Sequence, residues 1–231
     1  MQAFNLLQPG AIDDAIAAAQ AHGTKYIAGG SDLMQLMKDN VEVPTQLVDL
    51  EGVGLSDIHA DAGGLRLGAM ARMSDVAAHP AVRERWPVIS EALLASASPQ
   101  VRNMGTMGGN LLQRTRCSYF RDTGFSCNKR EPGSGCPAVK GESRMLAILG
   151  VSDQCIATHP SDLPVALMAL DATLSLRGAN GAQRQVQIAD FYRLPGDTPD
   201  VETVLVPGEL IESVTVADTP AARNSDRKSV V

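Results

Sequence analysis

All four cysteines of the chain, Cys117, Cys127, Cys136 and Cys155, lie in one segment that is also rich in Gly, Arg and Asn. This segment, residues 110–162, is polar, and it is longer than an ordinary connection inside a compact domain, which is typical of functional or disordered loops. A disordered segment has no reason to collect every cysteine of a protein. A metal centre with soft thiolate ligands would need four cysteines brought together in this way.

Other uses of the four cysteines stay open at this point. Two disulfides would suit an exported protein, but the N-terminal sequence lacks the basic and apolar regions of a signal peptide. A structural zinc site usually has closely spaced pairs, whereas the gaps here are nine, eight and eighteen residues, with no C-x-x-C. The familiar ferredoxin spacings are absent too. Spacing alone therefore leaves an iron–sulfur cluster, a zinc site and free or disulfide-bonded cysteines as alternatives.

The composition limits the classes of function. The 231 residues are 44% hydrophobic and 20% charged, as in an ordinary globular protein, and no apolar run is long enough to span a bilayer. A net charge of -6 and an aromatic content of 3% argue against nucleic acid as a partner. We expect a cytoplasmic location, or a periplasmic one reached by export with a partner that carries the signal.

Basic residues nevertheless cluster around the cysteine segment. A phosphate group, an anionic metal cluster or an acidic partner would each explain this clustering, and a solvated loop would explain it equally well for any single residue. The cluster consists of Arg102, Arg114, Arg116, Arg121, Lys129, Arg130 and Lys140.

A glycine turn near the N-terminus is a second candidate site. Residues 26–28 read as a short strand, Gly29-Gly30-Ser31-Asp32 follow at once, and residues 33–38 have a helical pattern. Such a turn aims successive backbone N–H groups at one point, where an anion can bind. The turn lacks the six-position Rossmann fingerprint and the lysine of a P-loop. A plain helix cap at Ser31 or Asp32 explains the same residues.

Periodicity along the rest of the chain predicts an α+β fold. We expect helices over residues 9–21, 86–97 and 161–170, a glycine-bearing loop over 101–110, and strands at 47–50, 65–69, 173–177, 184–188, 201–206 and 210–216. The Gly- and Asp-rich residues 52–64 are expected to join a small N-terminal lobe to a larger one. The predicted lobes are residues 1–57 and 58–218, with an insertion at 111–159 and a tail at 219–231, and a ligand is expected between the lobes.

Four motifs in order carry a resemblance to a known family. They are AGGSDL at 28–33, RNMGTMGGN at 102–110, PSD at 160–162 and PGELI at 207–211. The chain resembles, to about Asp218, the FAD-binding medium subunit of the xanthine dehydrogenase and molybdenum hydroxylase family. Residues 113–162 are similar to the branch that includes the bacterial aldehyde oxidoreductase flavin subunit, which carries an extra [4Fe–4S] cluster. The resemblance implies a two-lobed FAD-binding fold of the PCMH/vanillyl-alcohol-oxidase type with an inserted iron–sulfur loop.

The resemblance also implies roles for individual residues. The first loop would hold the FAD diphosphate on its amides, with Gly29 and Gly30 permitting an approach that a Cβ would block. Side chains and backbone of the second loop would contact the diphosphate or the flavin, Asp162 would accept hydrogen bonds from the cofactor, and two apolar residues would pack on the flavin. The implied FAD residues are Ile27, Ala28, Gly29, Gly30, Ser31, Asp32, Leu33, Thr106, Gly109, Asn110, Asp162, Leu210 and Ile211. Cys117, Cys127, Cys136 and Cys155 would ligate the [4Fe–4S] cluster.

No general acid or base stands out, so the chain is expected to transfer electrons within an oxidoreductase and to be inactive alone. The implied partners are a molybdenum-cofactor subunit and a small [2Fe–2S] subunit, with neither nucleic acid nor a membrane span. The polar residues 219–231 stand where family members continue into a further domain, which is expected to be missing. The alternatives are a self-contained FAD oxidoreductase of the same fold and a non-catalytic scaffold with four cysteines on zinc.

Overall fold

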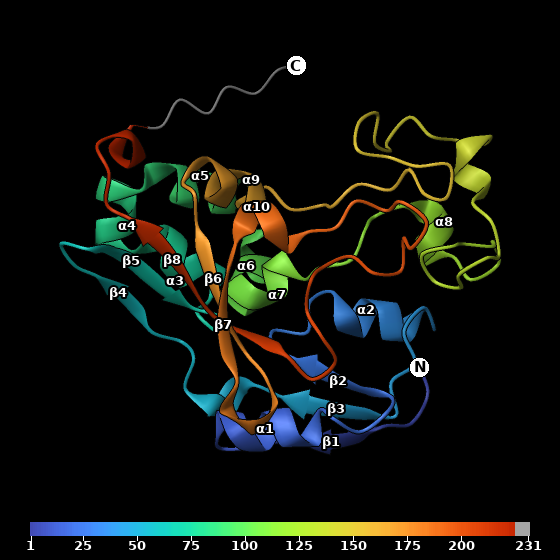
Figure 1. Ribbon diagram of the computed structural model, residues 1–231, viewed down its shortest axis with the longest axis horizontal. Helices are drawn as coiled ribbons and strands as arrows, with labels where there is room; N and C mark the ends of the chain where they lie inside the picture. Colours follow the sequence, from blue (N-terminus) through green and yellow to red (C-terminus); the bar gives the residue numbers. More distant parts are fainter. Residues whose placement is uncertain (225–231) are drawn as a thin grey trace.

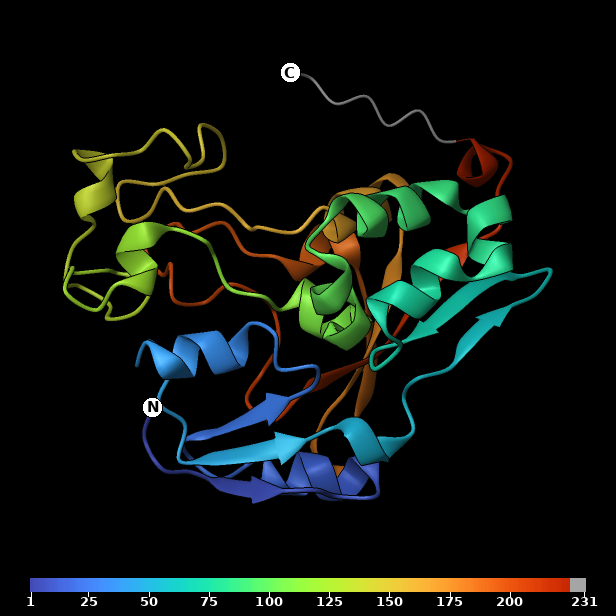
Figure 2. The ribbon, with the colours of Figure 1, turned by 180° about the vertical axis from the view of Figure 1, so that it is seen from behind.

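The computed structural model describes residues 1–224, and its N-terminal part is a small parallel sheet (Figure 1). Strand β3 (Gln46–Asp49) lies between β1 (Asn5–Leu7) and β2 (Thr24–Ile27). Parallel neighbours need crossover connections. The helices α1 (Ile12–Ala18) and α2 (Leu33–Lys38) provide them, and Figures 1 and 2 show these helices on opposite sides of the sheet.

A five-stranded antiparallel sheet forms the larger part. Strand β8 (Leu210–Ala217) is its centre, and the order across the sheet is β4-β5-β8-β6-β7. Apolar residues alternate along β5, β6 and β8 and are buried, as expected for strands with one face on a core. The other four strands are β4 (Ile58–Ala60), β5 (Gly64–Gly68), β6 (Thr173–Arg177) and β7 (Gln183–Gln187).

Short helices cover this sheet and share its core. Trp86, Ile89 and Leu93 are fully buried together with apolar residues of β5, β6 and β8. Figure 2 shows the helices gathered on one side of the sheet. They are α3 (Met73–Ala78), α4 (Pro80–Arg85), α5 (Pro87–Ala95), α6 (Pro99–Met104), α7 (Met107–Leu111), α9 (Leu163–Ala169) and α10 (Ile188–Phe191).

Three expectations about elements are corrected. Residues 201–206 are not a strand: Thr203 forms only an isolated bridge with Tyr192, because the backbone here pairs with residues 191–193 and not with the larger sheet. Residues 52–64 do not merely connect the lobes, since they contain the edge strand β4. Residues 101–110 are not a loop but parts of α6 and α7, whose first turns are capped by the hydroxyl groups of Ser98 and Thr106.

The cysteine segment forms a projection beside α2 (Figures 1 and 2). Its regular elements are helix α8 (Ser118–Arg121) and a 3₁₀ turn at Pro137–Val139. Phe120, Cys117 and Cys127 pack with Leu36 and Val41 from the α2 region, so the insertion rests on the smaller sheet's helix. A helix long and apolar enough to cross a membrane is absent from residues 1–224.

The lobe boundary at residues 57 and 58 stays a prediction. Strands between residues 5 and 49 build the small sheet, and strands between 58 and 217 build the larger one. The predicted tail begins with a 3₁₀ turn at Ala221–Arg223, and its residues 225–231 lie outside the described part of the chain.

Candidate functional site

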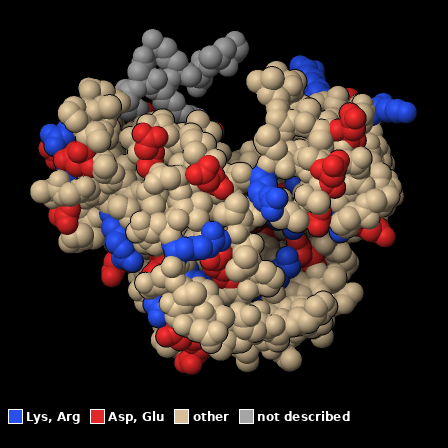
Figure 3. Space-filling model, in the orientation of Figure 1, with Lys and Arg blue, Asp and Glu red and all other residues tan. Residues whose placement is uncertain are grey.

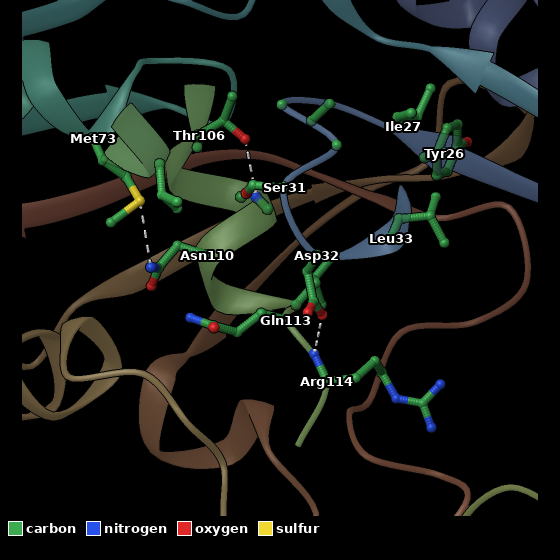
Figure 4. Close-up of a pocket in the computed structure, with 18 of the residues that line it drawn as sticks. Tyr26, Ile27, Ser31, Asp32, Leu33, Met73, Thr106, Asn110, Gln113 and Arg114 are labelled. Carbon is green, nitrogen blue, oxygen red and sulfur yellow. Dashed lines mark hydrogen bonds between the residues drawn. The ribbon is translucent and has the colours of Figure 1, made fainter. Parts of the chain in front are cut away.

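A cavity of about 630 Å³ lies between the two sheets. Its walls come from the turn between β2 and α2 and from α7 (Figure 4), and also from α6 and the first residues of β8. Twelve of the thirteen residues predicted to bind FAD line it: Ile27, Ala28, Gly29, Gly30, Ser31, Asp32, Leu33, Thr106, Gly109, Asn110, Leu210 and Ile211. The structure therefore brings together four motifs that lie far apart in the sequence.

The turn between β2 and α2 offers unpaired backbone donors to this cavity. The N–H groups of residues 29–33 donate no hydrogen bond to any other residue in the described range 1–224. Unpaired N–H groups in a cavity call for a ligand with acceptor oxygens, because leaving them unsatisfied costs free energy. A phosphate group offers such oxygens.

The two glycines of the turn also have structural reasons of their own, while their predicted role in the approach of a diphosphate stays a prediction. A Cβ at Gly29 would lie 1.8 Å from the carbonyl oxygen of Met104, so this glycine lets the turn pack against the end of α6. Gly30 has φ +68°, a left-handed conformation that favours glycine. A Cβ at Gly30 would face the side chains of Met34 and Ile27. Both glycines are therefore needed for the conformation of residues 29–33, whose N–H groups are unpaired.

Helix α7 presents the second motif to the cavity. The Thr106 hydroxyl accepts a hydrogen bond from the Gly109 N–H at 3.2 Å and is buried. Asn110 is also buried, and its side chain contacts Met73 Sδ at 3.5 Å (Figure 4) and accepts a hydrogen bond from the Ser161 hydroxyl. These contacts hold α7 in place and connect it to the PSD motif.

Asp162 is the predicted FAD residue that does not line the cavity. It stands at the start of α9, but its side chain makes no capping hydrogen bond. The neighbouring Ser161 caps the start of the helix instead, because its hydroxyl accepts a hydrogen bond from the Leu163 N–H at 3.2 Å. Pro160 is the residue of this motif that reaches the cavity wall.

The first residues of β8 form an apolar wall. Leu210 and Ile211 are buried and line the cavity, next to Met70. Tyr26 donates from its hydroxyl to the Gly208 carbonyl oxygen at 2.8 Å, which ties β2 to the turn before β8. Burial raises the pKa of Tyr26 to about 12, so its proton stays in place at neutral pH.

Sequence reasoning missed a further wall of the cavity, residues 96–98. Ala97 has φ +54°, which is unusual for a residue with a Cβ. The Arg102 guanidinium holds this turn by donating to the carbonyl oxygens of Leu94, Ser96 and Ala97. The Ser98-Pro99 pair is a helix-start signal that could have located this turn.

Titratable side chains that line the cavity already have partners. Their partners are opposite charges or, for Tyr26, a carbonyl oxygen. Glu209 illustrates this, because Arg184 contacts both its oxygens at 2.7 Å and lowers the pKa of its carboxyl. The paired groups are Lys25, Tyr26, Asp32, Glu42, Arg114, Arg116 and Glu209. Each titratable side chain that lines the described cavity is therefore held in place by a partner.

The four cysteines lie near one another in the insertion as free thiols. Cys117, Cys127 and Cys155 are buried, and Cys136 is partly exposed. Burial raises the pKa values of Cys117 and Cys155. Charge repulsion from Cys127 and Cys136 acts in the same direction. The Ala157 N–H points at Cys155 Sγ at 3.5 Å. No group of three His, Cys, Asp or Glu residues within 1–224 has the geometry of a metal site.

His159 closes the base of the insertion. Its Nε2 lies 3.2 Å from the Leu111 carbonyl oxygen, and its Nδ1 accepts from the Ser161 N–H at 3.4 Å. The Tyr192 hydroxyl donates to the same carbonyl oxygen at 2.9 Å. Desolvation lowers the pKa of His159, so the ring is neutral and Nε2 carries the proton. The sequence indicated no role for this histidine.

Unpaired N–H groups, an apolar wall and paired titratable groups define a protein that binds a large phosphate-bearing cofactor. Comparison with known proteins also indicates a cofactor-binding domain. Residues 2–218 match the family described as the FAD binding domain in molybdopterin dehydrogenase. The chain belongs to this family, and it is an oxidoreductase subunit with an α+β FAD-binding fold, as predicted.

Several relatives support this assignment. The chain is 53% identical over 215 residues to the aldehyde oxidoreductase FAD-binding subunit PaoB of Escherichia coli (strain K12), covering 93% of this chain and 68% of that protein. It is 26% identical over 220 residues to the carbon monoxide dehydrogenase medium chain of Afipia carboxidovorans, covering 94% and 59%. A solved structure of Cu,Mo-CO dehydrogenase matches with a TM-score of 0.68 and 26% identity, over 95% of this chain and 60% of that one.

Proposed function

We propose that the cavity holds FAD and that the chain is the electron-transfer flavin subunit of a molybdenum-dependent oxidoreductase of the aldehyde or xanthine type. This proposal rests on one observation: the N–H groups of residues 29–33 are unpaired and belong to a turn that lines the cavity. FAD, when bound, supplies the redox chemistry, and the protein supplies binding and orientation.

The proposed roles of the residues follow from their positions. The N–H groups of residues 29–33 bind the diphosphate oxygens. A second wall of the cavity is formed by Thr106, Gly109 and Asn110. The flavin ring packs on the apolar surface of Leu210 and Ile211. Asp162 is not among the residues that line the cavity, whereas Pro160 of the same motif is.

We propose that Cys117, Cys127, Cys136 and Cys155 hold a [4Fe–4S] cluster. Free and mostly buried thiols gathered in one insertion are the type of ligand that such a cluster takes. N–H groups directed at the sulfurs, such as that of Ala157, stabilise negative charge there. The thiols must move closer together to share one cluster, and the free energy of ligand binding orders a polar loop that burial alone does not.

The proposed partners are a molybdenum-cofactor subunit, which oxidises the substrate, and a small [2Fe–2S] subunit, which relays electrons to this chain. The complex is proposed to work in the cytoplasm, or in the periplasm after export together with a partner. Two readings compete with this proposal. A self-contained FAD oxidoreductase would oxidise its substrate alone, and a zinc-bound insertion would leave the flavin as the one redox group.

An absorption spectrum of the purified chain, with iron, sulfide and zinc analysis, separates these readings. Flavin bands with broad iron–sulfur absorbance and four irons per chain support the proposal. Flavin bands with zinc and no iron contradict the cluster. Each Cys→Ser variant should lose most of its iron, and three variants with full iron and sulfide would contradict the four-cysteine assignment. Oxidation of aldehydes by the lone chain with a dye acceptor would contradict the subunit role.

A further inference from the structure

Asp32 stands in the proposed diphosphate turn, yet its side chain points to the insertion. Its Oδ2 accepts a hydrogen bond from the Arg114 N–H at 2.8 Å, which Figure 4 shows as a dashed line. Its Oδ1 accepts from Arg121 Nη2 at 2.7 Å, and Arg116 Nη1 lies 3.2 Å away. Both oxygens of the carboxylate are therefore used by the first residues of the insertion.

The Asp32–Arg121 ion pair directly connects the turn at residues 29–33 to the insertion. The two side chains are 15% and 17% exposed, so the pair is shielded from most of the solvent. Arg121 also donates from Nε to the Thr115 carbonyl oxygen at 2.8 Å and from Nη2 to the Arg114 carbonyl oxygen at 2.9 Å. A single guanidinium thus fixes the path of residues 114–121, which contain Cys117.

A second set of ion pairs runs parallel to this contact. Arg114 contacts Glu42, which follows α2, at 2.5 Å, and it also contacts Glu202. Glu202 lies 2.9 Å from Lys129, whose side chain is 9% exposed and sits two residues after Cys127. Figure 3 shows basic and acidic side chains together where the insertion meets the N-terminal part. These ion pairs hold the insertion beside α2 in addition to the apolar contacts of Phe120, whereas Asp32 is the residue that joins it to the turn at residues 29–33.

A carboxylate in a turn that receives a diphosphate would repel it unless a cation neutralised the carboxylate. Arg121 and Arg116 come from the insertion and supply that neutralisation. The insertion must therefore be ordered for the turn to accept an anion well. By linkage, an anion in the turn must favour the ordered insertion to the same extent.

We propose that Asp32 is a positioning residue that couples the two sites: binding of FAD in the turn orders the first residues of the cysteine insertion through the Asp32–Arg121 pair, and the ordered insertion strengthens FAD binding. This inference rests on the proposed FAD site. It assigns the Asp32 carboxylate to the insertion and leaves the diphosphate to the N–H groups. Coupling between sites of this kind is typically five- to 150-fold in affinity.

Hydrogen exchange of residues 113–121 in the full chain, with and without saturating FAD, tests the coupling. In the native sequence FAD should slow exchange of this segment at least fivefold. Asp32→Asn should remove the FAD-dependent change, Arg121→Gln should do the same, and the double variant should add nothing further. Asp218→Asn is a matched control, because Asp218 contacts Arg85 at 2.7 Å with 12% and 21% exposure, away from both sites. It should keep the FAD-dependent change.

In a chain that binds FAD, three outcomes would overturn the coupling: no effect of FAD on the native segment, an undiminished effect in Asp32→Asn, or an undiminished effect in Arg121→Gln. If Asp32→Asn does not fold, hydrogen exchange of Arg121→Gln tests the coupling. Iron analysis of the same samples separates this test from the cluster proposal. FAD-dependent protection in iron-free protein would support the coupling while contradicting the cluster. A chain that takes up no FAD would overturn both the proposed site and the coupling.

Discussion

A single methyl group at Gly29 should separate the two segments that enclose the cavity. An ideal Cβ at this position lies 1.8 Å from the Met104 carbonyl oxygen and 2.6 Å from its carbonyl carbon, whereas real Cβ contacts essentially never fall below 3.0 Å. The turn and the end of α6 therefore have to part by about 1.2 Å. Both sides of the contact are backbone, so a change of rotamer gives no relief.

Overpacking of this kind costs about 1–3 kcal/mol. The free protein can relieve the strain by opening the turn, but FAD binding requires the turn closed, so the strain returns on binding. At about 1.4 kcal/mol for each tenfold change, the Kd for FAD in Gly29→Ala should rise about five- to 150-fold. Titration of the FAD-free protein, followed by flavin fluorescence, measures this rise, and thermal unfolding checks the fold.

Gly10→Ala is the matched control, because no atom lies within 4 Å of its ideal Cβ. It should leave both the Kd and the Tm unchanged. A Gly29→Ala protein with the native Kd for FAD and the native Tm would refute the reasoning, since it would mean that the contact with Met104 does not define the cavity.

Three further predictions concern Gly30 in the turn, His159 at the base of the insertion and the Arg184–Glu209 pair. Gly30→Val should lower the free energy of unfolding by at least about 1–2 kcal/mol, as denaturant unfolding would measure, because a branched residue must adopt φ +68°. His159→Phe should flatten the pH dependence of stability below about pH 6.5: the native pKa is lowered, so the native protein loses stability as pH falls through that range, and an unchanged slope would contradict the assigned neutral ring. Arg184→Gln should cost about 1 kcal/mol at neutral pH and reduce the loss of stability below about pH 4.5, because the pKa of Glu209 is then lowered less; urea unfolding at pH 3–7 tests both.

Periodic segments of the fold could be predicted, whereas segments defined by tertiary contacts could not. Alternating apolar residues indicated β6 and β8 within a residue or two. Strand β1 escaped prediction, because its three residues are exposed and it exists only by pairing with β3. Helices α6 and α7 escaped because Gly105, Gly108 and Gly109 read as a loop, although capping hydroxyl groups start both helices.

Most of the candidate site could be predicted because motifs in a fixed order carry family information that no single motif carries. The contacts of Asp32 could not be predicted. Arg121 lies 89 residues further along the chain, and nothing in local sequence says which of several nearby arginines a carboxylate will choose. Likewise, the reason for Gly29 lies in a backbone atom of a distant helix, which no pattern of residue types reveals.

The central place of β8 has a consequence for how the protein is made. This strand, Leu210–Ala217, pairs with β5 and β6 on its two sides, so β5 has no partner on its inner edge until the ribosome has synthesised residue 217. Contacts between segments so far apart in sequence form slowly, and unpaired strand edges invite aggregation during synthesis. Leu210 and Ile211 also complete the cavity wall. Cofactor loading must therefore follow synthesis of residues 210–217, and a chaperone that shields β5 until then would raise the yield of loaded protein.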